Sequence, residues 1–223
     1  MEIDYSDTSP KEAVMMQREL RHQIKLQPLQ KPVTTIAGAD LSFNRFSQIV
    51  HAGIVVLSFP DFEIIDKAGV TDITRFPYVP GLLGFKEVPA LSQAWEKLKI
   101  KPDVLVVDGH GYAHPRRMGI ATHFGVVMNT PTIGCAKTKL VGEYKEPLNV
   151  AGAMSDLTHE EELIGKVYRT KVNCKPIFIS PGNLITMEES LSLVSLCVRR
   201  YRIPEPTRLT HNFVNEVRLN YGK

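Results

Sequence analysis

Cysteine, long apolar runs and excess charge are all scarce in this sequence. Its three cysteines, Cys135, Cys174 and Cys197, are too widely spaced for a disulfide framework or a zinc site. No run of about 18 apolar residues occurs, so we expect no membrane-spanning helix. The N-terminus, Met1 to Asp4, is acidic and has no apolar segment, which argues against a signal peptide. We therefore expect a protein of the reducing cytoplasm.

The charge balance is nearly even, with 27 lysines and arginines against 24 acidic residues and a net charge of +3. Such a balance permits nucleic-acid binding without arguing for it. Hydrophobic residues make up 43% and charged residues 23%, as in globular proteins with a sizeable core. We expect one domain over residues 1–223, with an N-terminal helix at about 10–26, a core at 33–200 and a C-terminal tail at 201–223.

Periodicity and turn residues predict strands first, and then helices alternating with strands. The predicted strands cover residues 36–43, 52–57, 63–70, 103–108, 131–137, 163–170 and 176–180. Short links make the first three an antiparallel meander. The predicted helices begin at the capping box Ser9-Pro10-Lys11-Glu12, at Glu87 with Pro89 in the first turn, at Met118 and at the capping box Thr186-Met187-Glu188-Glu189. Strands that alternate with helices favour a sheet covered by helices.

Three segments are predicted to lack regular structure. Residues 74–86 form a loop stiffened by two prolines, residues 141–160 form a long connection, and the tail is weakly structured. One alternative stays open in the connection, because Thr158-His159-Glu160-Glu161 could cap a helix.

Two predicted strands carry a carboxylate that a hydrophobic core would not tolerate alone. Val104 to Val107 is apolar throughout, as in a strand buried on both faces, and Asp108 follows it directly. Asp40 interrupts another strand, where Gly38 leaves room for a close approach. If these strands are neighbours, both aspartates reach one point, in the crevice where ligands bind to such sheets.

Glu87 is a third carboxylate at the end of an apolar segment. Carboxylates that lie close together raise each other's pKa, and a divalent cation removes the conflict. Oxygen ligands suit Mg²⁺ or Mn²⁺, which serve phosphoryl chemistry. Plainer explanations stay open, namely an edge-strand charge for Asp40, a helix-dipole partner for Glu87 and a capped turn for Asp108.

The residues after Asp108 could hold phosphates or a planar ligand. His114 and Arg116 follow a glycine-rich turn, and arginine binds phosphate through paired hydrogen bonds. Gly109 and Gly111 would let backbone groups approach a flat ligand closely. A solvated loop is the alternative.

Lys137, at a strand end, could balance a bound phosphate or be an ordinary surface lysine. We interpret His110 and His123 as hydrogen-bonded structural histidines. His211 lies in the predicted tail, where an exposed histidine is the plain explanation.

Seven motifs together resemble the endonuclease V family, from about residue 33 to residue 211. They are Ala37-Gly38-Ala39-Asp40, Pro77-Tyr78-Val79-Pro80-Gly81-Leu82-Leu83, Phe85-Lys86-Glu87, Val107-Asp108-Gly109-His110-Gly111, His114-Pro115-Arg116-Arg117, Gly134-Cys135-Ala136-Lys137 and Pro204-Glu205-Pro206-Thr207-Arg208. The block around Asp108 and the loop around Tyr78 are too specific for chance agreement.

This resemblance implies an α/β fold of the RNase H-like type, with a mixed central sheet flanked by helices. It implies a Mg²⁺-dependent DNA repair endonuclease, with Mn²⁺ able to substitute, that recognises deoxyinosine, the deamination product of deoxyadenosine. Such an enzyme hydrolyses the second phosphodiester bond 3′ to the lesion and leaves 3′-hydroxyl and 5′-phosphate ends. An endoribonuclease for inosine in RNA and a non-catalytic module that binds deaminated nucleic acid are the alternatives. We expect a monomer.

The resemblance also implies residue roles. Asp40, Glu87 and Asp108 are the implied metal ligands, with Lys137 and His211 completing the catalytic set. Tyr78 matches the family's wedge, which enters the space that the damaged base leaves. The other implied nucleic-acid contacts are Pro77, Pro80, Leu83, Gly109, Gly111, His114 and Arg116, with the base read by backbone groups near Leu83, Gly109 and Gly111.

Three positions depart from the family pattern. Lys86 stands where many members have arginine, which keeps the charge and weakens a bidentate contact. Cys135 replaces a common valine. Asn183 stands where a histidine is frequent, which puts any role of that histidine in doubt here.

Overall fold

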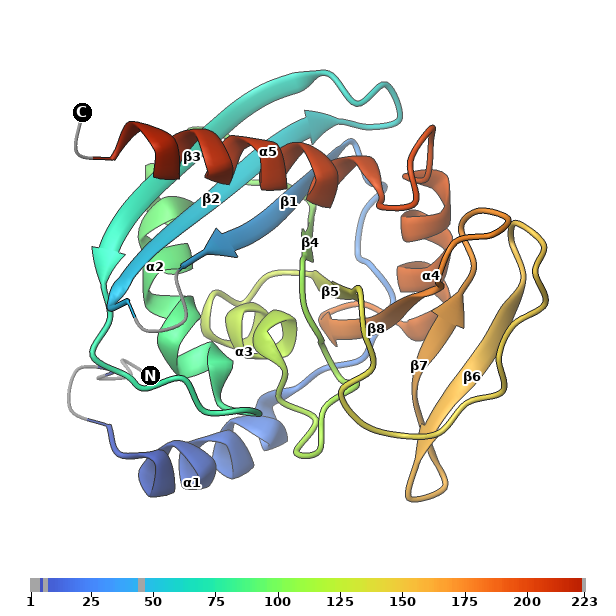
Figure 1. The fold of residues 1–223 in the computed structure, drawn as a ribbon, viewed down its shortest axis with the longest axis horizontal. Helices are drawn as coiled ribbons and strands as arrows, with labels where there is room; N and C mark the ends of the chain where they lie inside the picture. Colours follow the sequence, from blue (N-terminus) through green and yellow to red (C-terminus); the bar gives the residue numbers. More distant parts are fainter. Residues whose placement is uncertain (1–4, 6–7, 44–46, 222–223) are drawn as a thin grey trace.

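A computed structural model describes residue 5, residues 8–43 and residues 47–221. An eight-stranded sheet of order β3-β2-β1-β4-β5-β8-β7-β6 runs through the molecule (Figure 1). The strands are β1 Thr35–Ser42, β2 Ile49–Ser58, β3 Ile64–Ile73, β4 Val104–Val107, β5 Thr132–Ala136, β6 Met154–His159, β7 Glu162–Tyr168 and β8 Ile177–Asn183. The helices are α1 Pro10–Leu20, α2 Leu83–Lys97, α3 Ile120–Val127, α4 Met187–Leu196 and α5 Glu205–Asn220, with a short 3₁₀ turn at Arg21–Gln23.

The sheet is mixed, as predicted. β1, β2 and β3 form the predicted antiparallel meander, whereas β4 and β5 run parallel to β1 and to each other. β8 and β7 then continue the sheet in antiparallel pairing. Among the described residues, no helix is long and apolar enough to cross a membrane. The predictions on residues 1–4 and on residues 44–46, in the link between the first two predicted strands, concern positions outside the described residues.

Helices cover both faces of the sheet, and each face has its own apolar cluster. Leu105 and Val107 of β4 point toward α2 and α3, and Val104 and Val106 point toward the face that α4 and α5 cover. All four side chains are fully buried. The predicted character of a strand buried on both faces is therefore confirmed, and Asp108 follows on the α5 face by the same alternation.

The prediction of a weakly structured C-terminal tail is wrong, because residues 205–220 form helix α5. α5 lies across β1, β2 and β3 and packs against all three (Figure 1). Phe213 and Leu209 of this helix contact the apolar cluster on that face. The two prolines at 204 and 206 suggested irregular chain, but they stand at the start of the helix, where proline is tolerated.

Other differences concern single elements. α1 ends at Leu20 rather than near residue 26, and α2 begins at Leu83, inside the predicted loop. Pro89 therefore lies within α2 and beyond its first turn. The connection at 141–160 contains the edge strand β6, which pairs with β7. Glu160 and Glu161 form the intervening turn with φ of 55° and 63°, so no helix is capped there. Such turns normally carry glycine or asparagine, which explains why the pattern was missed.

Candidate active site

The neighbouring strands β1 and β4 bring two carboxylates together. Gly38 pairs with Val106 in parallel register, and the N–H of Asp108 donates to the carbonyl of Ala39 at 2.9 Å. Asp40 and Asp108 each follow this pair by two residues, so they lie on the same face of the sheet as Gly38 and Val106. The expected meeting of the two aspartates is thus what the structure shows.

Helix α5 adds His211 to this pair. Its Nδ1 lies 2.7 Å from Asp40 Oδ2, and one ligand atom from each of Asp40, Asp108 and His211 fits within 4.8 Å of the others. Gly38 permits this arrangement, because a Cβ there would stand 2.0 Å from the carbonyl oxygen of Pro206 at the start of α5. The space beside Asp40 is therefore occupied by a helix of the same chain.

Glu87 approaches from the opposite layer of the fold. It lies in the first half of α2, is only 8% exposed, and stands outside the group formed by Asp40, Asp108 and His211. Burial raises its pKa to about 8, and the negative charges of Asp40 and Asp108 add to the effect while Lys86 opposes it. A nearby cation would strongly stabilise the ionised form of a carboxyl in such surroundings.

The pKa of Asp40 is also raised, first by burial and then by the negative charge of Asp108, while the hydrogen bond from His211 opposes both. Two crowded carboxylates and one imidazole are a donor set that suits a divalent cation. The residues present thus fit a metal at this point, with Glu87 facing it from α2.

Lys137 follows β5 and forms an ion pair with Asp108 Oδ2. Its carbonyl oxygen accepts a hydrogen bond from Arg202 at 3.1 Å, and the same guanidinium also donates to the carbonyls of Lys175 and Pro176. Arg202 thereby fixes the chain from which Lys137 reaches the site. Sequence reasoning missed Arg202, because its partners are backbone oxygens that no side-chain pattern reveals.

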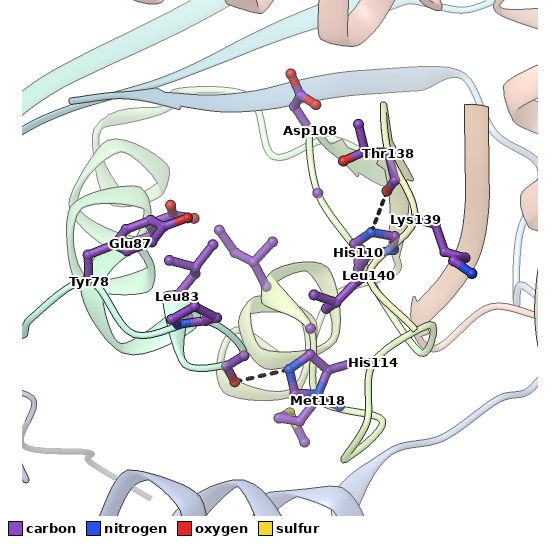
Figure 2. Close-up of a pocket in the computed structure, with 16 residues that line it drawn as sticks. Tyr78, Leu83, Glu87, Asp108, His110, His114, Met118, Thr138, Lys139 and Leu140 are labelled. Atoms are coloured by element: carbon purple, nitrogen blue, oxygen red, sulfur yellow. Dashed lines mark hydrogen bonds between the residues drawn. The ribbon is translucent and has the colours of Figure 1, made fainter. Parts of the chain in front are cut away.

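A cavity of about 290 Å³ lies next to the carboxylates. Figure 2 shows Tyr78, Leu83 and Glu87 on one side of it and Asp108 and His110 on the other. Its volume is at the lower end for small-molecule sites. No side chain caps the N-terminus of α2 beside Leu83. The first backbone N–H groups of this helix therefore donate to no capping side chain.

The cavity collects most of the predicted contact residues. Tyr78, Pro80, Leu83, Gly109 and His114 line it. Pro77, Gly111 and Arg116 do not belong to the lining, and the position of Gly111 is explained by its own hydrogen bonds. Its N–H donates to Ser180 Oγ, its carbonyl accepts from the N–H of Gly119, and a Cβ on it would collide with Pro181. The absence of a side chain at Gly111 lets the backbone pack closely against Pro181 behind the cavity wall.

His114 and Arg116 both turn toward the segment that carries Tyr78. We call residues 77–81 the Tyr78 loop. His114 Nε2 lies 3.0 Å and the guanidinium of Arg116 2.8 Å from the carbonyl oxygen of Gly81. Burial, followed by the charge of Arg116, lowers the pKa of His114 to about 3, so this ring is neutral near pH 7. Gln17 of α1 joins the same group and was also missed.

The three departures from the family pattern have local explanations. Lys86 is buried, and its ammonium lies 5.2 Å from the centre of the Phe43 ring. Asn183 is buried, donates to the carbonyl of Gly125 and accepts from the N–H of Lys25, so it has a structural role. Cys135 is a free thiol in the apolar core, where burial raises its pKa.

A mixed sheet of this order, with one carboxylate within β1 and another directly after the adjacent parallel strand β4, defines an RNase H-like protein. The family model of endonuclease V matches residues 18–212. The chain therefore belongs to the endonuclease V family, a family of metal-dependent nucleases.

Individual relatives agree with this assignment. Endonuclease V of Dehalococcoides mccartyi is 44% identical over 205 residues, which cover 92% of this chain and 92% of that protein. The structure of endonuclease V from Bacillus subtilis matches with a TM-score of 0.92 and 32% identity, covering 98% of this chain and 96% of the other. Endonuclease V of Ciona intestinalis, in complex with a 24mer DNA containing an inosine followed by a ribo-adenosine, matches with a TM-score of 0.80 and 26% identity over 94% of this chain and 97% of the other.

Proposed function

We propose that this nuclease is a Mg²⁺-dependent DNA repair endonuclease for deoxyinosine. It hydrolyses the second phosphodiester bond on the 3′ side of the lesion and leaves 3′-hydroxyl and 5′-phosphate ends. The observation that carries the proposal is the group of Asp40, Asp108 and His211, which stands next to a small cavity lined by Tyr78. The complex of the Ciona intestinalis relative with inosine-containing DNA supports the choice of lesion.

Asp40, Asp108 and Glu87 hold the metal in this proposal, and His211 either joins them or orients Asp40 through their hydrogen bond. When bound, Mg²⁺ supplies charge stabilisation at the phosphate and activates water, and Mn²⁺ is able to substitute. Lys137 carries the positive charge next to Asp108 and steadies that carboxylate. The positive charge of a bound metal would offset the burial and the mutual repulsion that raise the pKa values of Asp40 and Glu87.

The cavity receives the extruded base. Tyr78 is 45% exposed, belongs to a proline-bracketed loop and has the Phe43 ring beside it at 6.3 Å, so its ring is accessible to a base stack. Backbone groups near Leu83 and Gly109 read the hypoxanthine edge, and the uncapped N-terminus of α2 offers donors for it. Arg116 contributes positive charge for the phosphate backbone beside its contact with Gly81.

One observation favours a second candidate, an endoribonuclease for inosine-containing RNA. The DNA bound to the Ciona intestinalis relative has a ribo-adenosine directly after the inosine. A 2′-hydroxyl at that position is what distinguishes RNA from DNA. We also propose that the chain acts as a single domain and as a monomer in the cytoplasm.

A side-by-side digestion tests the proposal. DNA and RNA oligonucleotides of one sequence, each with a single inosine, are incubated with the enzyme, first without divalent metal and then with Mg²⁺. We expect one cut in the DNA, at the second bond 3′ to inosine, that requires Mg²⁺ and is abolished in Asp108→Asn. RNA cut much faster than DNA would establish the second candidate instead. Binding without cleavage under all conditions would leave only a non-catalytic module.

A further inference from the structure

The carbonyl oxygen of Gly81 accepts hydrogen bonds from three side chains. They come from Gln17 Nε2 at 3.0 Å, Arg116 at 2.8 Å and His114 Nε2 at 3.0 Å. A carbonyl oxygen has two lone pairs, so three donors saturate it. This carbonyl therefore has little freedom to move.

Gln17 connects this carbonyl with helix α1. Ala13, Gln17 and Leu20 are the buried residues of the helix, at the spacing of a stripe that packs inward. Gln17 is the polar member of the stripe and is only 1% exposed. Besides Gly81, its amide nitrogen donates to the carbonyl of Met118 at 3.1 Å, and its oxygen accepts from Arg116 Nε at 2.5 Å. One buried amide thus connects α1 with two other segments, the Tyr78 loop and residues 116–118.

His114 reinforces the same geometry. Its Nδ1 accepts from the backbone N–H groups of Arg116 and Met118, at 3.1 and 3.4 Å. The ring proton is therefore on Nε2, which donates to Gly81. Gly81 has a φ of 79°, a conformation that glycine adopts without strain. The group fixes the Tyr78 loop at the residue where the chain turns into α2.

Apolar contacts seat the loop on α1 as well. Ala13 belongs to one buried cluster with Phe76, Leu82 and Phe85, and Val79 packs against it. These contacts hold the loop near α1, but they are not directional. The hydrogen bonds on the Gly81 carbonyl are directional, so they fix the orientation of the Tyr78 loop and with it the direction in which the exposed Tyr78 ring points.

We propose that Gln17 is a positioning residue for base recognition, and that α1 thereby belongs to the lesion-reading apparatus. The proposal rests on the proposed function above. Gln17 is buried and carries no charge, so it cannot reach the nucleic acid itself. Any effect of Gln17 on recognition passes through the Tyr78 loop and through Arg116.

The experiment compares two substitutions at Gln17 with a control in the same helix. Gln17→Met keeps length and removes both donor and acceptor. Gln17→Glu keeps the acceptor for Arg116 and places a carboxylate oxygen against the carbonyls of Gly81 and Met118. Ser9→Ala removes the capping box of α1, in which Ser9 and Glu12 bond each other, and leaves the Gly81 contacts in place.

The kinetic readout is KM and kcat on inosine-containing DNA, with binding to the matched undamaged duplex in parallel. We expect both Gln17 variants to raise KM roughly five- to tenfold, as one lost hydrogen bond does, with kcat within about twofold of wild type. Binding to undamaged DNA should weaken less, because there only the phosphate contact of Arg116 is affected. Ser9→Ala should lower the melting temperature without changing KM.

Three results would overturn the proposal. One is a wild-type KM in Gln17→Met, or in Gln17→Glu if the methionine variant does not fold. Another is an equal rise in KM in Ser9→Ala, since general loosening of α1 would then explain the effect. A wild-type enzyme that leaves inosine DNA intact would instead refute the proposed function, and this inference with it.

Discussion

Replacing Gly38 with alanine tests how closely α5 must lie on β1. The new Cβ would stand 2.0 Å from the Pro206 carbonyl oxygen and 2.5 Å from Thr210 Oγ1. Ordinary contacts begin at 3.4 Å, so the first turn of α5 must retreat by roughly 1.4 Å. The atom in the way is backbone, which cannot rotate aside. The whole start of the helix has to move.

The expected size of the effect follows from this displacement. Overpacking of this kind costs about 1–3 kcal/mol of folding free energy. In a protein of this length, each kcal/mol lowers the melting temperature by about 2–4 °C. His211 follows Thr210 directly in α5, and its 2.7 Å contact with Asp40 would lengthen. A shift of ~1 Å at reacting groups can cost about 100-fold in rate. We therefore expect kcat/KM to fall by about that factor.

Gly53→Ala is the matched control, because Gly53 lies under the same helix on β2. A Cβ there would meet Val214 Cγ2 at 2.6 Å and the Phe213 ring at 3.1 Å, which are side-chain atoms that can rotate. We expect a lower melting temperature and a nearly unchanged cleavage rate. The assays are thermal unfolding and single-turnover cleavage of an inosine oligonucleotide. If Gly38→Ala cleaves like wild type, or loses activity only as much as Gly53→Ala, this account of α5 is wrong.

Two further predictions concern Tyr78 and His123. Tyr78→Ala should weaken binding to inosine DNA by about 1–3 kcal/mol, the value of one stacked base, and binding to undamaged DNA by less; equal losses would show that the ring does not probe the lesion. Burial lowers the pKa of His123 from 6.5 to about 4. The folded protein therefore keeps this ring neutral while the unfolded chain takes up a proton, and the free energy of unfolding falls by up to ~3 kcal/mol as the pH drops from 6.5 toward 4. Urea unfolding at pH 7 and pH 4.5 measures this loss, which His123→Asn should reduce; an unchanged loss would contradict it.

The core of the fold and half of the site were readable from the sequence. The apolar run before Asp108 and the alternation around Asp40 specify two strands and the face that each carboxylate occupies. These are local patterns, and the structure preserves them. Local patterns did not place His211, which only the family resemblance put in the catalytic set. The amphipathic pattern of α5 was hidden behind two prolines, and its partner strand lies far away in the sequence.

Gln17 illustrates a second limit of prediction from sequence. Its place between Ala13 and Leu20 on the inward stripe was visible, and a buried polar side chain needs partners. Those partners are the backbone of Gly81 and Met118 and the side chain of Arg116, which only tertiary structure brings near. Sequence patterns identify that such a residue needs partners, and the fold decides which ones it has.

The contact between His211 and Asp40 joins residues 171 positions apart. A ribosome releases β1 first, then β4, and α5 last. A nascent chain can therefore pair its two aspartates long before it has the imidazole that accompanies them. The order of synthesis is also the order in which the site is assembled, and docking of α5 reports that all eight strands of the sheet have already been made.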